Sequence, residues 1–157
     1  MRQLTTGVRP HVTITRSVFL ISILASAACA GKRTDPAHLP SEPTAAVREF
    51  LDAVKANDLK RMGTLWGSNR GPASTWMKGD ELQKRLTVMR SVLVHDSVAI
   101  ETGSAPGGAP EERVVRVRLT RKGCTPVVPF TARQYRGRWL VSSIDLQAAG
   151  NPARSCP

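Results

Sequence analysis

The apolar residues of this 157-residue chain change their spacing near the middle, and that change limits the folds open to it. Between residues 44 and 90, apolar residues recur three and four positions apart, which is the spacing of amphipathic helices. Between residues 92 and 146 they alternate with polar residues, as in strands that bury one face. Helices followed by a run of strands predict an α+β fold in which the helices pack on one face of an antiparallel sheet.

The first half predicts helices separated by clear breaks. We expect Thr44 to cap the first helix, Asn57-Asp58 to end it and cap a second, and Asp80 to cap a third. Residues 67–79 contain Gly71-Pro72 and are interpreted as a loop. The apolar stripes of the helices consist of Val47, Phe50, Leu51 and Val54; of Leu59, Met62, Leu65 and Trp66; and of Leu82, Leu86 and Met89.

The second half predicts a four-stranded antiparallel meander, curved under the helices. Pro129 favours an edge or strand-start position, because proline cannot donate to a ladder. Arg136-Gly137-Arg138 indicates a tight turn, and the Gly- and Pro-rich residues 102–110 indicate a loop. The expected strands cover residues 92–100, 115–120, 127–135 and 139–146.

The first 30 residues differ in composition from the rest. They contain no acidic residue, and arginines at positions 2, 9 and 16 precede an apolar run from Val18 to Ala28. A basic region, a short apolar region and small residues in that order are typical of an export signal. The uncharged stretch is too short for a spanning helix, which needs about 20 residues, so a retained membrane anchor is the weakest interpretation.

Cys29 follows the small residues Ala27 and Ala28, and this arrangement resembles the lipobox of bacterial lipoproteins. In that family the cysteine is acylated and becomes the mature N-terminus. Ser26 departs from the pattern, which has a branched aliphatic residue at this position. The resemblance implies a membrane-anchored lipoprotein of the cell envelope that faces the periplasm or the exterior; ordinary cleavage at an A-x-A site would give a secreted soluble protein instead. The implied organisation is a signal peptide over 1–28, a lipid-anchored flexible tether over 29–43 and one domain over 44–157.

The chain has three cysteines, and their number fits that assignment. If Cys29 carries lipid, Cys124 and Cys156 remain as a pair in a compartment that permits disulfides. A Cys124–Cys156 disulfide would tie the end of a strand to the C-terminal tail. Two free buried cysteines are the alternative, and neither residue has a neighbour at the spacing of metal ligands.

The formal net charge of +11 is spread along the chain. No basic motif interleaved with aromatic residues occurs, and export argues against a nucleic-acid partner. The charge is compatible with an anionic membrane or wall surface, or with solubility alone.

Three segments resemble the NTF2-like superfamily, whose cone-shaped, cystatin-like α+β fold encloses a pocket between sheet and helices. They cover residues 46–54, 56–59 and 135–141. The resemblance implies one of three roles: binding of a small apolar ligand or a protein partner, homodimerisation through the sheet, or isomerase or dehydratase chemistry in the pocket.

Asp96 is the candidate general base for the enzymatic alternative. In a regular strand it shares a face with Val94 and Val98, and a carboxylate in an apolar pocket suits proton abstraction. An ion pair with an arginine of the next strand is the competing interpretation. His95 would lie on the opposite face, at the surface. Further candidates for lining the pocket are Trp66, Trp76 and Tyr135; the competing interpretation of each is a packing residue of the core or the hairpin.

Established catalytic motifs are missing from the sequence. It contains no G-x-S-x-G, H-E-x-x-H, EF-hand or P-loop pattern, and His95 is the sole histidine after the predicted tether. We therefore expect no metal and no cofactor. The favoured hypothesis is a non-enzymatic envelope lipoprotein that binds a small ligand or a partner, with the Asp96 pocket enzyme as the alternative.

Overall fold

The computed structural model of the chain describes residues 39–101 and 105–150. Its helices are α1 (Pro43–Lys55), α2 (Leu59–Leu65), α3 (Gly79–Leu93) and α4 (Leu146–Ala149), with a short 3-10 helix, η1, at Ala73–Thr75. The main sheet consists of β3 (Ser97–Ile100), β4 (Ala105–Pro106), β5 (Glu112–Thr120), β6 (Val127–Tyr135) and β7 (Arg138–Ile144). The strands β1 (Gly67–Ser68) and β2 (Gly71–Pro72) form a separate hairpin.

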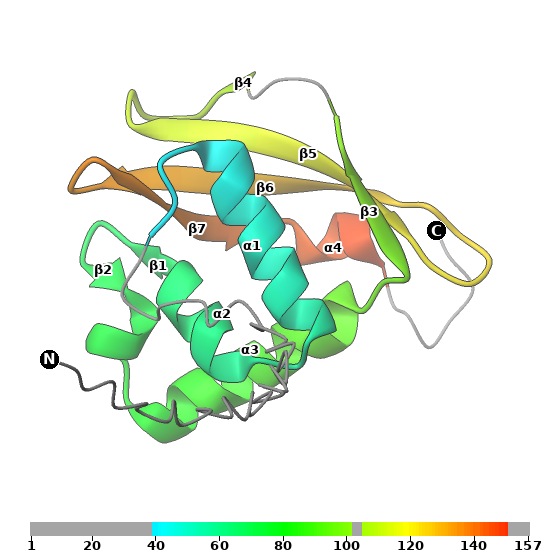
Figure 1. Cartoon of the computed structure of the whole chain (residues 1–157), viewed down its shortest axis with the longest axis horizontal. Helices are drawn as coiled ribbons and strands as arrows, with labels where there is room; N and C mark the ends of the chain where they lie inside the picture. The colour runs from blue at the N-terminus through cyan, green and yellow to red at the C-terminus, as the bar shows by residue number, and fades with distance from the viewer. Residues whose placement is uncertain (1–38, 102–104, 151–157) are drawn as a thin grey trace, which may run out of the picture. The chain divides into compact units, whose positions relative to one another are not determined.

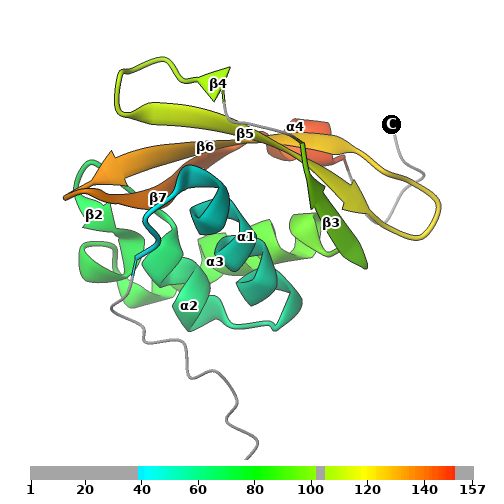
Figure 2. The ribbon, with the colours of Figure 1, turned by 45° about the horizontal axis from the view of Figure 1, so that its top comes forward.

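The α+β prediction is confirmed. Strands β3, β5, β6 and β7 pair in that order, all antiparallel, and form the predicted meander as an open sheet. The two-residue strand β4 adds a fifth member by pairing with β5 on the same side as β3. Helices α1, α2 and α3 cover one face of this sheet (Figures 1 and 2). The strand β7 is left at an edge, which matters for the site described below.

The core lies between α1 and the middle of the sheet. Val47, Phe50 and Leu51 of α1 have no exposed surface, and neither have Val117 of β5 and Phe130 of β6. All five belong to one contiguous cluster of buried side chains. Burial of such side chains contributes about 1.5–3 kcal/mol each, so this layer dominates the stability of the domain.

The helix starts partly differ from the sequence prediction. Asp58 caps α2 as expected, and its carboxylate accepts a hydrogen bond of 2.8 Å from the Arg61 backbone N–H. Helix α1 begins at Pro43, before Thr44, since the N–H that proline lacks would have no hydrogen-bond partner within the first turn of the helix. Helix α3 begins at Gly79, so Asp80 lies in the first turn, where the helix dipole favours a carboxylate, instead of capping it.

The strand predicted to start at Val92 starts later, because α3 continues through Leu93. Leu93 is fully buried and follows Met89 at helical spacing, so the last apolar residues of this segment belong to the helix stripe. As a consequence His95 is buried, with Nδ1 2.9 Å from the carbonyl oxygen of Leu93, and Asp96 is exposed. The expected surface position of His95 is therefore wrong.

The last predicted strand ends early for a similar reason. Strand β7 stops at Ile144, and Asp145 caps α4 by accepting a hydrogen bond of 2.9 Å from the Ala148 N–H. Residues 67–79, predicted as a loop, form the β1–β2 hairpin and η1. In both places a short capping or turn motif determines the local structure, and short motifs escape periodicity arguments.

The prediction of a tight turn at Arg136-Gly137-Arg138 holds. Arg136 and Gly137 have φ angles of 50° and 74°, the left-handed pair of a tight hairpin turn between β6 and β7. Pro129 lies within β6, yet β7 has already ended beside it, and its carbonyl accepts the Asp145 N–H at 3.0 Å. Its missing N–H therefore faces a position that is locally an edge.

Cys29, the predicted signal peptide and most of the predicted tether lie outside the described residues. Cys156 does too, so the Cys124–Cys156 disulfide stays a prediction. Among the helices in the described part of the chain, none is both long enough and apolar enough to cross a membrane.

Candidate functional site

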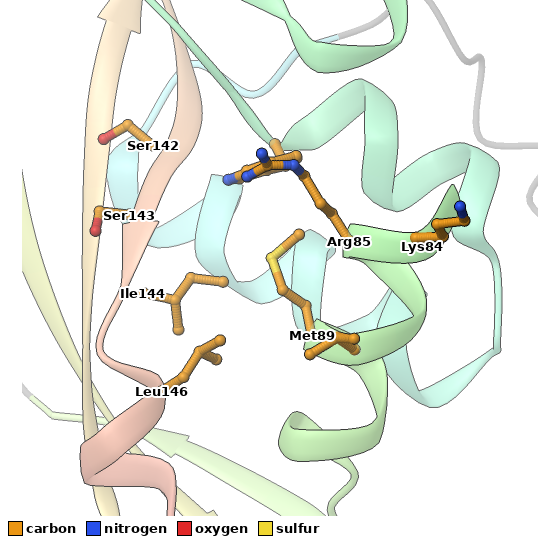
Figure 3. A pocket seen from close by; sticks show the side chains of 9 residues that line it. Lys84, Arg85, Met89, Ser142, Ser143, Ile144 and Leu146 are labelled. Atoms are coloured by element: carbon orange, nitrogen blue, oxygen red, sulfur yellow. The ribbon is translucent and has the colours of Figure 1, made fainter. Parts of the chain in front are cut away.

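A pocket of about 440 Å³ lies between α3 and the C-terminal part of β7 (Figure 3). This volume is in the usual range of small-molecule sites, about 300–1,000 Å³. We call it the α3–β7 pocket. It is lined by Trp66, Lys84, Arg85, Val88, Met89, Ser142, Ser143, Ile144 and Leu146.

The inner part of the α3–β7 pocket is apolar. Met89 of α3 and Ile144 of β7 point into the space from opposite walls, and Leu146 lies below Ile144 (Figure 3). Trp66, the residue that ends α2, contributes an aromatic side chain. Val88 adds an apolar side chain that is 57% exposed, although Met89 beside it is only 7% exposed. An apolar wall thus opens to solvent at this point.

The rim of the pocket on α3 is cationic. Arg85 extends from α3 toward β7, whereas Lys84 turns outward (Figure 3). Arg85 pairs with Glu81 one turn earlier: Nη2 and Nε lie 2.8 and 3.0 Å from Oε1 of Glu81. Within the described part of the chain, no carboxylate lies within salt-bridge distance of Lys84.

A second hollow, of about 430 Å³, is polar, and we call it the polar hollow. Arg133 provides its cation, but Nη1 and Nη2 already contact Glu111 and Glu112 at 3.1 and 2.6 Å. Its β6 residues alternate with Phe130 and Ala132, which face the helices, so it belongs to the other face of the sheet. The lining residues are Ser68, Asn69, Glu112, Thr131, Arg133, Ser142 and Ser143.

Of the aromatic residues predicted to line a pocket, Trp66 does so. Trp76 is fixed elsewhere: its indole N–H donates 3.1 Å to the Gly71 carbonyl, and the Arg70 guanidinium lies 4.4 Å from its ring centre. Tyr135 packs on the same hairpin, so close that a Cβ on Gly71 would lie 2.9 Å from its ring. Trp76 and Tyr135 line neither hollow and have packing roles.

The structure contradicts the assignment of Asp96 as a general base in a pocket. Asp96 is exposed and lines neither the α3–β7 pocket nor the polar hollow. Its backbone N–H donates to Thr120 at 2.8 Å, and its carbonyl accepts the Lys55 ammonium at 2.7 Å. The prediction failed because the segment before Asp96 is helical, so the strand alternation assumed for Val94 does not apply.

Sequence reasoning missed most of the pocket lining, namely Lys84, Arg85, Val88, Met89, Ser142, Ser143, Ile144 and Leu146 as site residues. One signal was present. Val88 lies off the Leu82, Leu86 and Met89 stripe, on the otherwise polar side of α3. An apolar residue outside the core stripe indicates a second apolar surface on the same helix.

The described residues contain no group of three or more histidine, cysteine, aspartate or glutamate side chains placed to hold a metal ion. On the helix-covered face of the sheet, the chemistry available is therefore an apolar cavity with two cationic side chains at its rim. Such a site can hold and orient a ligand.

Comparison with known proteins adds little to this picture. No family model matches the chain, and no curated protein matches it. A solved structure of a phospholipid-binding protein from Ralstonia solanacearum, in complex with a phospholipid, is similar with a TM-score of 0.36 and 16% identity over 67% of this chain and 75% of that one. A likeness this weak carries no argument about what this chain binds.

Proposed function

We propose that this chain is an exported, lipid-anchored cell-envelope protein whose NTF2-like domain binds a small apolar molecule in the α3–β7 pocket. The observation that carries the proposal is the exposed Val88 beside Met89 and Ile144, at the mouth of a pocket with an apolar interior. Apolar surface left open to water in a concave site gains free energy when a ligand covers it, at about 25 cal/mol per Å². The helices-then-meander order supports the choice of fold family.

A binding role is favoured over catalysis by the composition of the pocket. Its polar members are Lys84, Arg85, Ser142 and Ser143, and its lining includes no carboxylate and no histidine. General acid–base catalysis needs a titratable group within hydrogen-bond reach of the substrate, at a pKa near the working pH. Arg85 cannot give up its proton in that range, and Lys84 turns outward (Figure 3).

The location rests on the N-terminal sequence. The basic, acid-free start and the small residues before Cys29 support export and acylation. Mass spectrometry of the mature N-terminal peptide from a membrane fraction tests this. A diacylglyceryl-modified Cys29 is the expected result, and an unmodified N-terminus at Ala28 or Gly31 would reject the anchor.

Binding is tested with the neutral apolar dye N-phenyl-1-naphthylamine, whose fluorescence rises in apolar surroundings. We expect saturable binding by the purified protein at one site. Val88→Asn puts a polar group on the pocket wall and should weaken dye affinity about tenfold, because the bound dye would desolvate the amide. Val94→Asn is the matched control. Val94 is exposed to a similar extent, 48% against 57% for Val88, but it does not line the pocket.

The binding proposal fails if the dye shows no saturable binding. It also fails if Val88→Asn and Val94→Asn change the affinity equally, because the dye would then bind at some other apolar surface. Circular dichroism of both variants establishes that the fold is retained.

A further inference from the structure

We infer that the natural ligand of the α3–β7 pocket is an amphiphile of the fatty-acid class, with its chain among Met89, Ile144 and Leu146 and its carboxylate on Arg85. The inference rests on the proposed binding function and specifies the chemistry of the ligand. The inference is based on the charged side chains at the rim of the pocket, with which a purely apolar ligand would form no ion pair or hydrogen bond.

Arg85 has donors to spare for such a head group. A guanidinium carries five N–H donors in a planar fork, and Glu81 takes one from Nε and one from Nη2, both through the same oxygen. Among the described residues, the remaining three N–H groups of Arg85 have no partner. A carboxylate can therefore bind the outer edge of the fork without displacing Glu81, and it would gain charge-assisted hydrogen bonds.

The lining of the pocket favours an anion. It includes two cations, Lys84 and Arg85, and no carboxylate, and among the described residues Glu81 is the one carboxylate within ion-pair distance of either cation. The polar hollow has the opposite balance, because Arg133 contacts both Glu111 and Glu112. Charge complementarity therefore favours the α3–β7 pocket over the polar hollow as the site of an anionic head group. Within that pocket, the position for the head group is the Arg85 guanidinium.

A single bound molecule fits this rim better than a membrane surface. The apolar lining is recessed, with Met89 only 7% exposed, so a flat bilayer would not reach it. Asp80 and Glu81 are exposed in the first turn of α3, next to the rim, and would repel a broad anionic surface. One carboxylate on the free edge of the Arg85 guanidinium avoids that repulsion.

Calorimetric titration of the purified protein with dodecanoate and with dodecanol tests the inference, because the two share a chain and differ in the head group. We expect dodecanoate to bind at least about tenfold more tightly at low salt, and this advantage to shrink as salt screens the exposed charges. Arg85→Gln should remove most of the advantage, and Lys84→Gln a smaller part. Dodecanol and N-phenyl-1-naphthylamine are titrated into the same variants, and a loss confined to dodecanoate assigns the effect to the head group.

Arg48→Gln is the matched control, because it removes the same charge from an exposed position on α1 outside the pocket. Equal affinities for dodecanoate and dodecanol would overturn the inference, and so would an equal loss in Arg48→Gln and Arg85→Gln. In both cases dye binding would leave the proposed function standing, whereas absence of dye binding would refute that function itself.

An anionic head group could also belong to a lipid in a membrane. Sedimentation with vesicles of neutral and of anionic phospholipid distinguishes this source from a single fatty-acid molecule. Binding to anionic vesicles that depends on Arg85, together with no binding of monomeric dodecanoate, would overturn the inference in favour of a membrane-surface site. Binding of monomeric dodecanoate, together with no Arg85-dependent binding to anionic vesicles, is the expected result.

Discussion

Helices α1 and α3 cover the same face of the sheet in different ways. Helix α1 buries Val47, Phe50 and Leu51 completely, in one cluster with side chains of β5 and β6. Helix α3 buries Leu86 and Leu93 but leaves Val88 exposed above a pocket that separates it from β7. The same layer of helices is thus fully buried at α1 and lines an open pocket at α3.

This difference indicates that the two helices have different roles: α1 packs the core, and α3 provides the surface available for a ligand. The α1 side carries the stability of the domain through apolar burial. The α3 side is held by fewer buried side chains and by a polar tie at its C-terminal end, so its free surface remains available for a ligand. Binding sites are commonly placed where such local packing is incomplete.

The strongest test of this comparison removes one large side chain from each helix. Phe50→Ala should cost about 3–5 kcal/mol of unfolding free energy, because a cavity would remain in a closed core. Met89→Ala should cost about 2 kcal/mol, the low end for such a change, because one side of Met89 already faces the pocket. Urea denaturation followed by circular dichroism measures both.

Equal losses for these two variants would show that the α3 side is packed as tightly as the α1 side. Met89→Ala should also change dye affinity, whereas a milder core variant, Val47→Ala, should not. The second readout keeps the test informative if Phe50→Ala fails to fold.

A polar tie at the end of α3 gives the next largest effect. The Arg121 guanidinium donates to the Ala149 carbonyl of α4 at 3.0 Å and to the Val92 carbonyl of α3. Burial lowers the pKa of Arg121 through desolvation, and the guanidinium nevertheless stays charged at neutral pH. Arg121→Met should cost about 2 kcal/mol, because both carbonyls lose a charged donor.

Arg118→Met provides the control for Arg121→Met, because Arg118 is an exposed arginine of β5, three residues before Arg121. A similar small loss of unfolding free energy in both variants would show that the hydrogen bonds of Arg121 stabilise the fold no more than an exposed arginine does. Urea midpoints give the comparison, and a drop in dye affinity confined to Arg121→Met would indicate that the tie also fixes the pocket wall.

The β1–β2 hairpin beside the pocket supplies a smaller test. Gly71 has a φ of 100° and lies against the Tyr135 ring. Gly71→Ala should cost about 1–3 kcal/mol, since alanine is strained at this φ and its Cβ would meet the ring. Combining Gly71→Ala with Tyr135→Ala separates the two causes in a double-mutant cycle: a coupling near zero would mean that backbone strain alone accounts for the loss.

The sequence predicted the layers of the fold because these depend on apolar periodicity. The α1 stripe and the alternation in β5 and β6 are long enough to be unambiguous, and the four-stranded meander follows from them. Short segments were predicted less well. The extension of α3 to Leu93 and the start of α4 at Asp145 depend on a few residues whose burial and capping are set by the tertiary structure.

The pocket was harder to predict than the fold. Its two walls are formed by residues 84–89 of α3 and residues 142–144 of β7. These two groups of residues are more than 50 positions apart in the sequence, so no local motif marks them. The error at Asp96 has the same origin, because moving the end of one helix by a few residues reversed which of His95 and Asp96 is buried. A site formed by an incomplete contact between elements becomes visible only when their packing is known.

The smallest expected effect concerns the sheet face turned away from both helices. Glu101 accepts hydrogen bonds from Arg116 at 2.9 Å and Arg118 at 3.2 Å, and these lower the pKa of Glu101, with the bond to Arg116 contributing most. A carboxyl whose pKa is lower in the folded state stabilises the fold above its unfolded pKa, and the contribution is lost as the pH falls through the folded value. Glu101→Gln should therefore lower the urea midpoint slightly at neutral pH, and the difference from the unsubstituted protein should vanish in acid. Because these groups are exposed, salt should shrink the neutral-pH difference as well. A difference that persists unchanged in acid would mean that Glu101 acts through packing, and the outer face would then resemble the closed α1 side more than an exposed charged surface.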